Sequence, residues 1–182
     1  MRKVIVYEYV TLDGVVEAPE KWQFPYFSDD VAEVIKSQIL DAGAILLGRA
    51  TYDIFAASWP SRTNNEFGVA DKLNNAPKYV VSSTLESPDW NNTTLIKENV
   101  LEEIAGLKQQ PGGEIGILGS ATLVQSLMGR ELIDEYRLMV HPIILGSGKR
   151  LFPEGVDLAL RLIEVKAFSS GVLLLRYLPD RK

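Results

Sequence analysis

Residues 117–127 read ILGSATLVQSL: an apolar run ends at Gly119-Ser120, and a helical pattern follows it. The apolar run predicts a buried strand, and the Gly-Ser pair predicts a tight turn into the helix. Glycine lets a ligand approach the backbone closely, and the free N–H groups at a helix start attract phosphate. The Ser120 and Thr122 hydroxyls could add donors. An ordinary turn capped by the serine explains the same residues, so this stretch alone leaves both interpretations open.

Residues 44–51, AILLGRAT, repeat the arrangement of a strand that runs into a helix. Arg49 is a potential bidentate phosphate donor, and Thr51 could cap the helix. A surface arginine beside a cap is the simpler explanation of this stretch alone. Two such crossings in one sheet favour ligand binding, because dinucleotides bind where the strands of an open α/β sheet end.

A third strand, residues 78–82, ends in the hydroxyls of Ser82 and Ser83 without a nearby acid. NAD sites usually hold the ribose 2′-hydroxyl with Asp or Glu, so hydroxyls suit a 2′-phosphate and favour NADP. A solvated strand end would look the same in the sequence.

The rest of the chain continues the alternation of strands and helices. Further strands are predicted at residues 4–10, 94–97, 136–141, 159–168 and 172–178, and further helices after Ser28 and after Asn99. Gly43 is expected to stop the first helix, and Asn99 with Glu102 has capping-box spacing. We therefore expect a single α/β domain over residues 1–182, with a mostly parallel sheet, helices on both faces and an antiparallel C-terminal hairpin that turns at Gly171.

Composition narrows the class of protein. The 182 residues are 46% hydrophobic, carry a net charge of −5 and include no cysteine. An acidic surface argues against nucleic acid as the partner. The absence of cysteine excludes disulfides and thiolate catalysis, and we expect no metal site. With no signal-peptide pattern and no apolar run long enough to cross a bilayer, we expect a cytoplasmic protein without a membrane partner.

Several residues could act on a substrate. Asp13 follows the first strand, where a carboxyl group is well placed for proton transfer, although an aspartate before glycine is common in turns. Trp22, Tyr52 and Trp59 could wall a flat substrate, although aromatic residues are more often part of a core. His141 is the only histidine and is expected to be structural.

Two nucleotide-binding motifs are absent. Residues 146–149, GSGK, look like the end of a P-loop, but Ile143 and Arg150 stand where that motif needs glycine and a hydroxyl residue. The chain also has no G-x-G-x-x-G sequence, so a standard Rossmann fingerprint is excluded.

Taken together, the motifs resemble the dihydrofolate reductase superfamily, and within it the stand-alone reductases that are similar to the RibD C-terminal domain. The resemblance rests on TLDG at 11–14, LLGRATYDIF at 46–55, KYVVSST at 78–84, ILGSATLVQSL at 117–127 and LIDEYRLMVHPIILGSGKRLF at 132–152. It implies a three-layer α-β-α fold of the dihydrofolate reductase type with NADPH lying across the sheet. Gly-Ser at 119–120 departs from the usual glycine pair, and there is no deaminase domain.

The resemblance also implies roles for individual residues. The cofactor would contact Gly48, Arg49, Thr51, Ser82, Ser83, Gly119, Ser120, Ala121, Thr122, Leu123 and Gly146. The substrate would contact Trp22, Tyr52, Trp59 and Leu145, and Asp13 would be catalytic. Gly148 belongs to the same loop as Leu145 and Gly146, and this loop would border the nicotinamide.

These expectations lead to an NADPH-dependent reductase that transfers a hydride to a small heterocyclic or ribosyl-bearing substrate, as a 5-amino-6-(5-phosphoribosylamino)uracil reductase or a dihydrofolate reductase does. The alternative is a nucleotide-binding or sensing protein that kept the fold and lost turnover, and a flavin-binding protein is a third possibility. A homodimer that pairs through strand edges is expected by analogy, with the apolar residues 172–178 as the surface to be covered.

Overall fold

Eight strands form one sheet in the order β4-β3-β2-β5-β1-β6-β8-β7 in a computed structural model that describes residues 1–180. The strands are β1 (Val4–Thr11), β2 (Ala42–Gly48), β3 (Lys78–Val81), β4 (Thr93–Ile96), β5 (Glu114–Leu118), β6 (Glu135–His141), β7 (Leu160–Ala167) and β8 (Leu173–Pro179). The first six pair in parallel, and β8 pairs antiparallel with both β6 and β7. The predicted α/β class and the antiparallel C-terminal hairpin are therefore confirmed.

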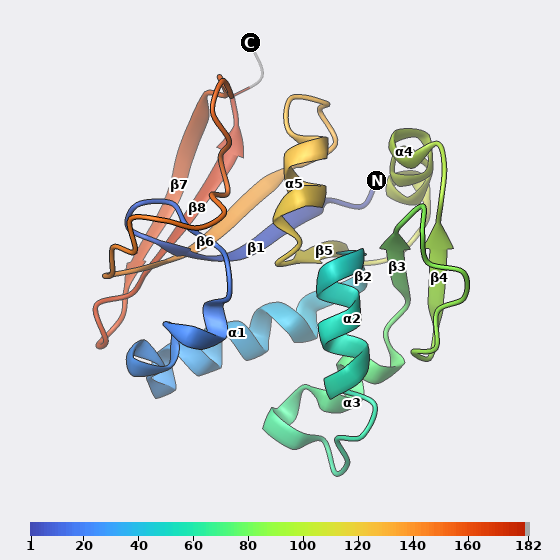
Figure 1. Ribbon diagram of the computed structural model, residues 1–182, viewed down its shortest axis with the longest axis horizontal. Helices are drawn as coiled ribbons and strands as arrows, with labels where there is room; N and C mark the ends of the chain where they lie inside the picture. The colour runs from blue at the N-terminus through green and yellow to red at the C-terminus, as the bar shows by residue number, and fades with distance from the viewer. Residues whose placement is uncertain (181–182) are drawn as a thin grey trace.

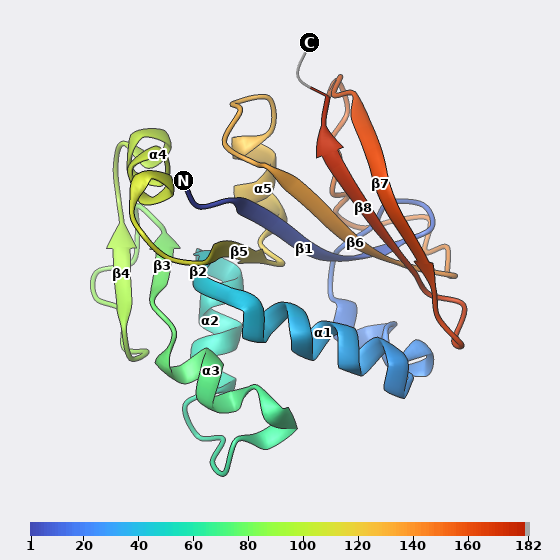
Figure 2. The same cartoon turned by 180° about the vertical axis from the view of Figure 1, so that it is seen from behind.

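Helices cover both faces of the sheet, as Figures 1 and 2 show from opposite sides. They are α1 (Asp29–Asp41), α2 (Arg49–Ser58), α3 (Ala70–Asn75), α4 (Val100–Gln109) and α5 (Ala121–Leu127). Side chains of α4 and α5 pack on one face, and those of α1, α2 and α3 pack on the other.

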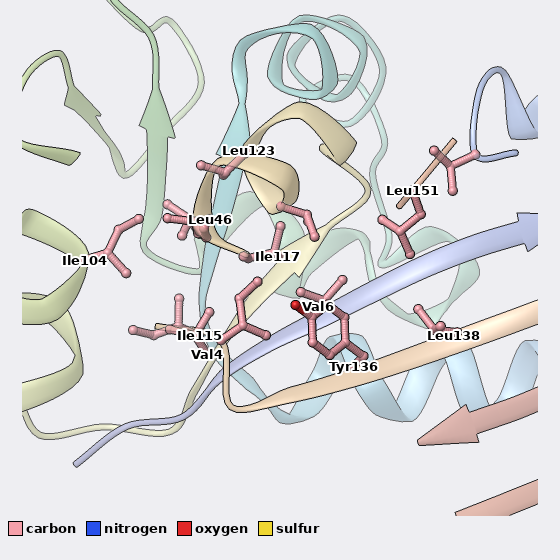
Figure 3. Close-up of a cluster of buried hydrophobic side chains, with 14 of the residues drawn as sticks. Val4, Val6, Leu46, Ile104, Ile115, Ile117, Leu123, Tyr136, Leu138 and Leu151 are labelled. Carbon is pink, nitrogen blue, oxygen red and sulfur yellow. The ribbon is translucent and has the colours of Figure 1, made fainter. Parts of the chain in front are cut away.

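Strand alternation supplies the two cores. On β1, Val4 and Val6 face α4 and α5, whereas Ile5 and Tyr7 face the opposite side. Figure 3 shows Val4 and Val6 among Ile115, Ile117 and Leu123 in the first of these cores. Because β1 and β5 are covered on both faces, their sequences are continuous apolar runs rather than alternating ones.

Gly43 acts differently from the prediction. It does not cap α1, which ends at Asp41, but lies in β2 at a register shift against β5. A Cβ atom placed on Gly43 would lie 2.8 Å from the Cα and N atoms of Gly113. The glycine is required because two backbones meet there, not because a helix stops.

Two smaller expectations also need correction. Asn99 precedes α4 with φ 51°, and its side chain makes no capping hydrogen bond, so the capping box does not form. Residues 172–178 are not the sheet edge, because β8 lies between β6 and β7. The edge strand at this end of the sheet is β7, on which Leu162, Ile163 and Val165 are 47%, 40% and 54% exposed.

Candidate functional site

Two strand-to-helix turns meet at the carboxyl end of the sheet. Strands β2 and β5 are parallel neighbours, so the turns that follow Gly48 and Leu118 lie side by side, and the starts of α2 and α5 adjoin in Figure 1. The Gly48 N–H donates to the Ser120 Oγ atom across 3.0 Å. The structure thus brings together the two turns that the sequence suggested as a shared phosphate site.

Two glycines, Gly48 and Gly119, line the contact between these turns. A Cβ atom on Gly48 would come no closer than 3.6 Å to the side chains of Leu123 and Ser120, and one on Gly119 would meet Thr51 at 3.6 Å. Gly119 and Ser120 both have positive φ, 57° and 66°. These two left-handed residues turn the chain sharply from the end of β5 into α5, whose first N–H groups have no acceptor within the helix.

The Ser120 hydroxyl serves the protein rather than a ligand. It accepts the Gly48 N–H and donates its own proton to the Leu118 carbonyl at 3.2 Å. What residue 120 can offer to a ligand in this arrangement is its backbone N–H. A left-handed conformation in a non-glycine residue costs roughly 1–2 kcal/mol and is often retained at functional sites.

Arg49 lies at the start of α2 and is ready to exchange partners. Its Nε atom contacts both carboxylate oxygens of Asp53 at 2.8 Å, and the two side chains are 40% and 51% exposed. An exposed ion pair of this kind contributes little to stability. An incoming phosphate can therefore compete with Asp53 for the guanidinium.

The other residues predicted to contact the cofactor differ in their solvent exposure. Ser82 is buried, and its Oγ accepts the N–H groups of Thr84 and Leu85, whereas Ser83 is exposed. On α5, Thr122 is exposed, but the Leu123 side chain lies in the core, so only its backbone N–H could reach a ligand. Ala121 is half-buried in the first turn.

Asp13 binds the loop that follows β6. Its carboxylate accepts the Thr11 hydroxyl at 2.6 Å, the Gly146 N–H at 2.9 Å and the Leu145 N–H at 3.3 Å. The Thr11 hydroxyl and then the two loop amides hold the pKa of Asp13 at about 2. The carboxylate is ionised at neutral pH and fixes the position of Leu145 and Gly146.

Sequence reasoning missed a second connection between the same segments. The Lys149 N–H donates to Glu17 Oε2 at 2.8 Å, and backbone bonds join Val16 to Lys149 and Leu151 to Gly14. The Lys149 ammonium group in turn contacts the Thr122 hydroxyl at the start of α5. Residues 143–151 are thereby held between the end of β1 and the first turn of α5.

Glu8 is a further residue that the sequence analysis did not consider. It is 6% exposed, its Oε1 atom has no hydrogen-bond partner among residues 1–180, and burial raises its pKa to about 8 despite the opposing charge of Lys149. The signal was present in the sequence, since Glu8 is the single charged residue in the first strand, VIVYEYVT.

The three predicted aromatic residues do not form one wall. Trp22 packs edge-on against His141 at 5.1 Å between ring centroids, and its indole N–H donates to the Glu17 carbonyl. Tyr52 is buried against Trp90, and Trp59 packs against Phe55 and Phe67. Phe55 also contacts Trp90, so Tyr52 and Trp59 belong to one aromatic cluster, and Trp22 lies apart from it beside His141.

His141 and Asp30 have structural partners. His141 is 2% exposed, is surrounded by Tyr9, Trp22 and Tyr26, and has a pKa that burial lowers. Asp30, in the first turn of α1, accepts the Ser169 N–H at 3.0 Å and the Ser169 hydroxyl at 3.1 Å. It thus joins α1 to the turn between β7 and β8.

The family model for the RibD C-terminal domain matches residues 2–174. The chain belongs to the RibD C-terminal domain family. It is therefore an oxidoreductase of the reductase type that characterises this family.

Individual relatives agree with this membership. The uncharacterized Bacillus subtilis (strain 168) protein YyaP is 31% identical over 179 residues, which cover 97% of this chain and 94% of YyaP. A proposed riboflavin biosynthesis protein from Shewanella sp. PV-4 superposes with a TM-score of 0.75 at 20% identity, covering 98% of this chain and 99% of that one.

A larger solved structure shares the same fold. The Thermotoga maritima diaminohydroxyphosphoribosylaminopyrimidine deaminase/5-amino-6-(5-phosphoribosylamino)uracil reductase superposes with a TM-score of 0.69 at 16% identity. The match covers 98% of this chain but 56% of that protein. Within residues 1–180, no helix is long and apolar enough to cross a membrane.

Proposed function

We propose that this RibD-family protein is an NADPH-dependent reductase that acts in the cytoplasm on a small heterocyclic or ribosyl-bearing substrate. The single observation that carries the proposal is the hydrogen bond between the Gly48 N–H and Ser120 Oγ, which holds the two backbone turns side by side. A dinucleotide diphosphate needs two such turns at neighbouring strand ends.

The residues around these turns fit the cofactor. Gly48 and Gly119 place no side chain between the turns, the N–H groups of residues 120 to 122 would provide donors, and the partly exposed Arg49 provides charge. Ser83 is exposed at the end of β3, where the ribose 2′-phosphate of NADP would lie. Because β3, β2, β5 and β1 are consecutive in the sheet, adenosine at β3 directs the nicotinamide toward β1.

When bound, the cofactor would supply a hydride to an electrophilic C=N or C=O carbon, and the heteroatom would need a proton. The protein's own task is to hold donor and acceptor in contact and exclude water. Asp13 contributes by fixing Leu145 and Gly146 against the end of β1. Its ionised carboxylate is suited to orienting a substrate N–H group, and a solvent proton would complete the reduction.

The substrate is proposed from the family. The similar Thermotoga maritima protein is a 5-amino-6-(5-phosphoribosylamino)uracil reductase by name, and a related pyrimidine is the first compound to test. Trp22, at the rim formed by Glu17 and His141, is the aromatic residue placed to contact a flat ring there.

Titration calorimetry with NADPH and with NADH tests the cofactor. We expect NADPH to bind at micromolar to submillimolar concentration and NADH at least tenfold more weakly, because the 2′-phosphate contributes charge-assisted hydrogen bonds. Absence of NADPH binding at millimolar concentration would overturn the proposal. Oxidation of NADPH at 340 nm with pterins, pyrimidines and small carbonyl compounds then identifies the acceptor.

One observation favours a second candidate, a nucleotide-binding protein without turnover. The only carboxyl group predicted to be catalytic, Asp13, is already engaged by Thr11 and two loop amides. Tight NADPH binding with no oxidation across the acceptor panel supports this alternative. A yellow sample with a visible absorbance band would instead indicate a flavin protein.

We also propose a homodimer in which β7 edges pair. The strand exposes Leu162, Ile163 and Val165 together with its unpaired edge, which natural proteins usually cover or charge. Light scattering should give a mass near twice 20.2 kDa, and Val165→Lys should shift it toward the monomer. A monomeric wild-type protein would refute this part.

A further inference from the structure

We propose that the Glu8 carboxyl group forms the floor of the nicotinamide subsite and pairs with the carboxamide of the ring. The inference rests on the proposed function, because it assigns one part of the cofactor to one residue. It begins from Glu8 itself, a charged residue type in the middle of the parallel sheet.

Glu8 lies beside the proposed diphosphate site. It follows Tyr7 on β1, and the Tyr7 carbonyl accepts the Gly119 N–H at 3.0 Å. By strand alternation its side chain shares the face of Val6 and Val10, which is the face that α5 covers. Figure 3 shows Leu123 of α5 and Leu151 on that side of β1.

The cofactor's length agrees with this position. Strands β3, β2, β5 and β1 are successive neighbours, and three strand spacings amount to about 14 Å. If the 2′-phosphate lies at the end of β3 and the diphosphate lies between β2 and β5, then the nicotinamide reaches β1 just beyond the point where β5 ends. Leu118, the last residue of β5, pairs with Tyr7, so Glu8 is the first residue of β1 past that point.

The carboxyl group lacks a partner that its burial requires. Oε1 is buried with no hydrogen bond among residues 1–180, and leaving such an atom unpaired is unfavourable. Its charged neighbour is Lys149, which is exposed and belongs to the loop that Asp13 and Glu17 hold.

The Glu8 carboxyl group and the nicotinamide carboxamide have complementary hydrogen-bonding groups. Burial raises the pKa of Glu8 to about 8, so at neutral pH the carboxyl group carries a proton. A protonated carboxyl group presents one O–H donor and one carbonyl acceptor side by side. A primary carboxamide presents the matching acceptor and donor, so two hydrogen bonds form at once.

Within residues 1–180, Lys149 is the one group with a resolved electrostatic effect on the pKa of Glu8. Helix α5 carries no titratable side chain between Ala121 and Leu127, and the partner of Glu8 on β6 is Leu138. The neighbouring Arg137 points to the opposite face, where it donates to the Tyr7 hydroxyl. The titration of Glu8 is thus governed by burial and by Lys149.

The test compares the binding of NADP⁺ with that of its 3-acetylpyridine analogue, in which a methyl group replaces the carboxamide nitrogen. At pH 7, calorimetry on the wild-type protein should show about tenfold weaker binding of the analogue, the cost of one buried hydrogen bond. Glu8→Leu should bind both compounds alike. Glu8→Gln should keep the preference, because an amide can pair with an amide.

The pH dependence is a second readout. Affinity of the wild-type protein for NADPH, whose nicotinamide ring is uncharged, should fall as pH rises above about 8, because ionised Glu8 has lost its O–H donor. Glu8→Gln should show no such fall. Glu102→Leu, a change of the same type on an exposed position of α4, is the control and should behave as the wild type.

The outcomes separate the two levels of inference. If wild-type protein binds NADP⁺ but Glu8→Leu retains the full preference over the analogue, then the assignment of Glu8 is wrong and the reductase proposal stands. If wild-type protein fails to bind NADP⁺ at millimolar concentration, the proposed function is overturned and the Glu8 assignment with it.

Discussion

The two ends of the β2–β5 strand pair use glycine for opposite purposes. At the amino end, Gly43 meets Gly113, and a Cβ atom on Gly43 would lie 2.8 Å from the Gly113 backbone. At the carboxyl end, a Cβ atom on Gly48 or Gly119 would have 3.6 Å to its nearest neighbour. At Gly43 and Gly113, backbone atoms of the two segments are in contact. At Gly48 and Gly119, space for a methyl group remains next to the start of α5.

This difference separates folding from binding within a single pair of strands. A side chain at the amino end must displace main chain, so it should lower the free energy of unfolding. A side chain at Gly48 fits the unliganded protein but would occupy the volume that a phosphate would need, whereas one at Gly119 would also be strained by the positive φ of that residue. The following predictions test this contrast, beginning with the largest effect.

Gly43→Ala should be the most destabilising of these changes. The new methyl group overlaps backbone atoms that belong to two paired strands, and overpacking of this kind lowers the free energy of unfolding by about 3 kcal/mol. Urea denaturation measures it. Gly106→Ala on α4 is the matched control, because a Cβ atom there meets nothing within 4 Å and alanine should stabilise the helix by about 0.5–1 kcal/mol.

Gly48→Ala should have little effect on stability and a large effect on cofactor binding. The residue has an extended backbone with φ −79°, so alanine should lower the free energy of unfolding by about 1 kcal/mol or less. NADPH affinity should fall at least tenfold, or about 1.4 kcal/mol, because the methyl group enters the phosphate space. Unchanged affinity would show that this turn does not contact the cofactor.

Substitutions at Ser120 separate its hydroxyl from its backbone. Ser120→Ala keeps the left-handed strain and loses the bond from the Gly48 N–H, so the free energy of unfolding should drop by about 1 kcal/mol. Ser120→Gly loses the same bond but relieves about 1 kcal/mol of strain, so it should stay near the wild type. Thermal unfolding of the two variants separates the energy of the hydrogen bond from that of the backbone strain. Equal losses of stability in the two variants would contradict the role of the hydroxyl.

The smallest effect concerns Asp13 and pH. The pKa of Asp13 is lowered from its ordinary value near 3.8 to about 2. The stabilisation that ionised Asp13 gives to the folded loop is therefore fully present above pH 3.8, and it is lost as the pH falls through about 2. The amide resonances of Leu145 and Gly146 should therefore titrate with a midpoint near 2. Asp13→Asn should abolish this titration and weaken NADPH binding only modestly, with global stability nearly unchanged.

The elements of the sheet could be predicted well because their signals are local. Buried parallel strands read as apolar runs, and the predicted strand at 4–10 is confirmed as β1 over Val4–Thr11. The turn at Gly119-Ser120 was also predictable, since a glycine at that point breaks the apolar run. The roles of Gly43 and Asn99 were not, because a glycine after a helix and an asparagine before one look like caps whether or not they act as caps.

The candidate site was predictable in its backbone and less so in its side chains. Gly48 and Gly119 follow from the pattern of strand and helix. The sequence could not show that the Ser120 hydroxyl points back to Gly48, or that Trp22 lies apart from the aromatic cluster that holds Tyr52 and Trp59. Such contacts depend on which elements become neighbours, and the spacing of residues along the chain carries no information on that.

The sequence by itself determined the α/β alternation, the two strand-to-helix turns and the membership of a reductase family, because periodicity and motif spacing are properties of local segments. Only the tertiary structure decided which strands are neighbours. The sheet order places β5 between β2 and β1, so it joins the two turns and buries Glu8 beside them. The physical reason is that parallel strands from distant parts of the chain all end on the same side of the sheet. Backbone donors and buried charges from different segments therefore meet there, and no single segment contains them all.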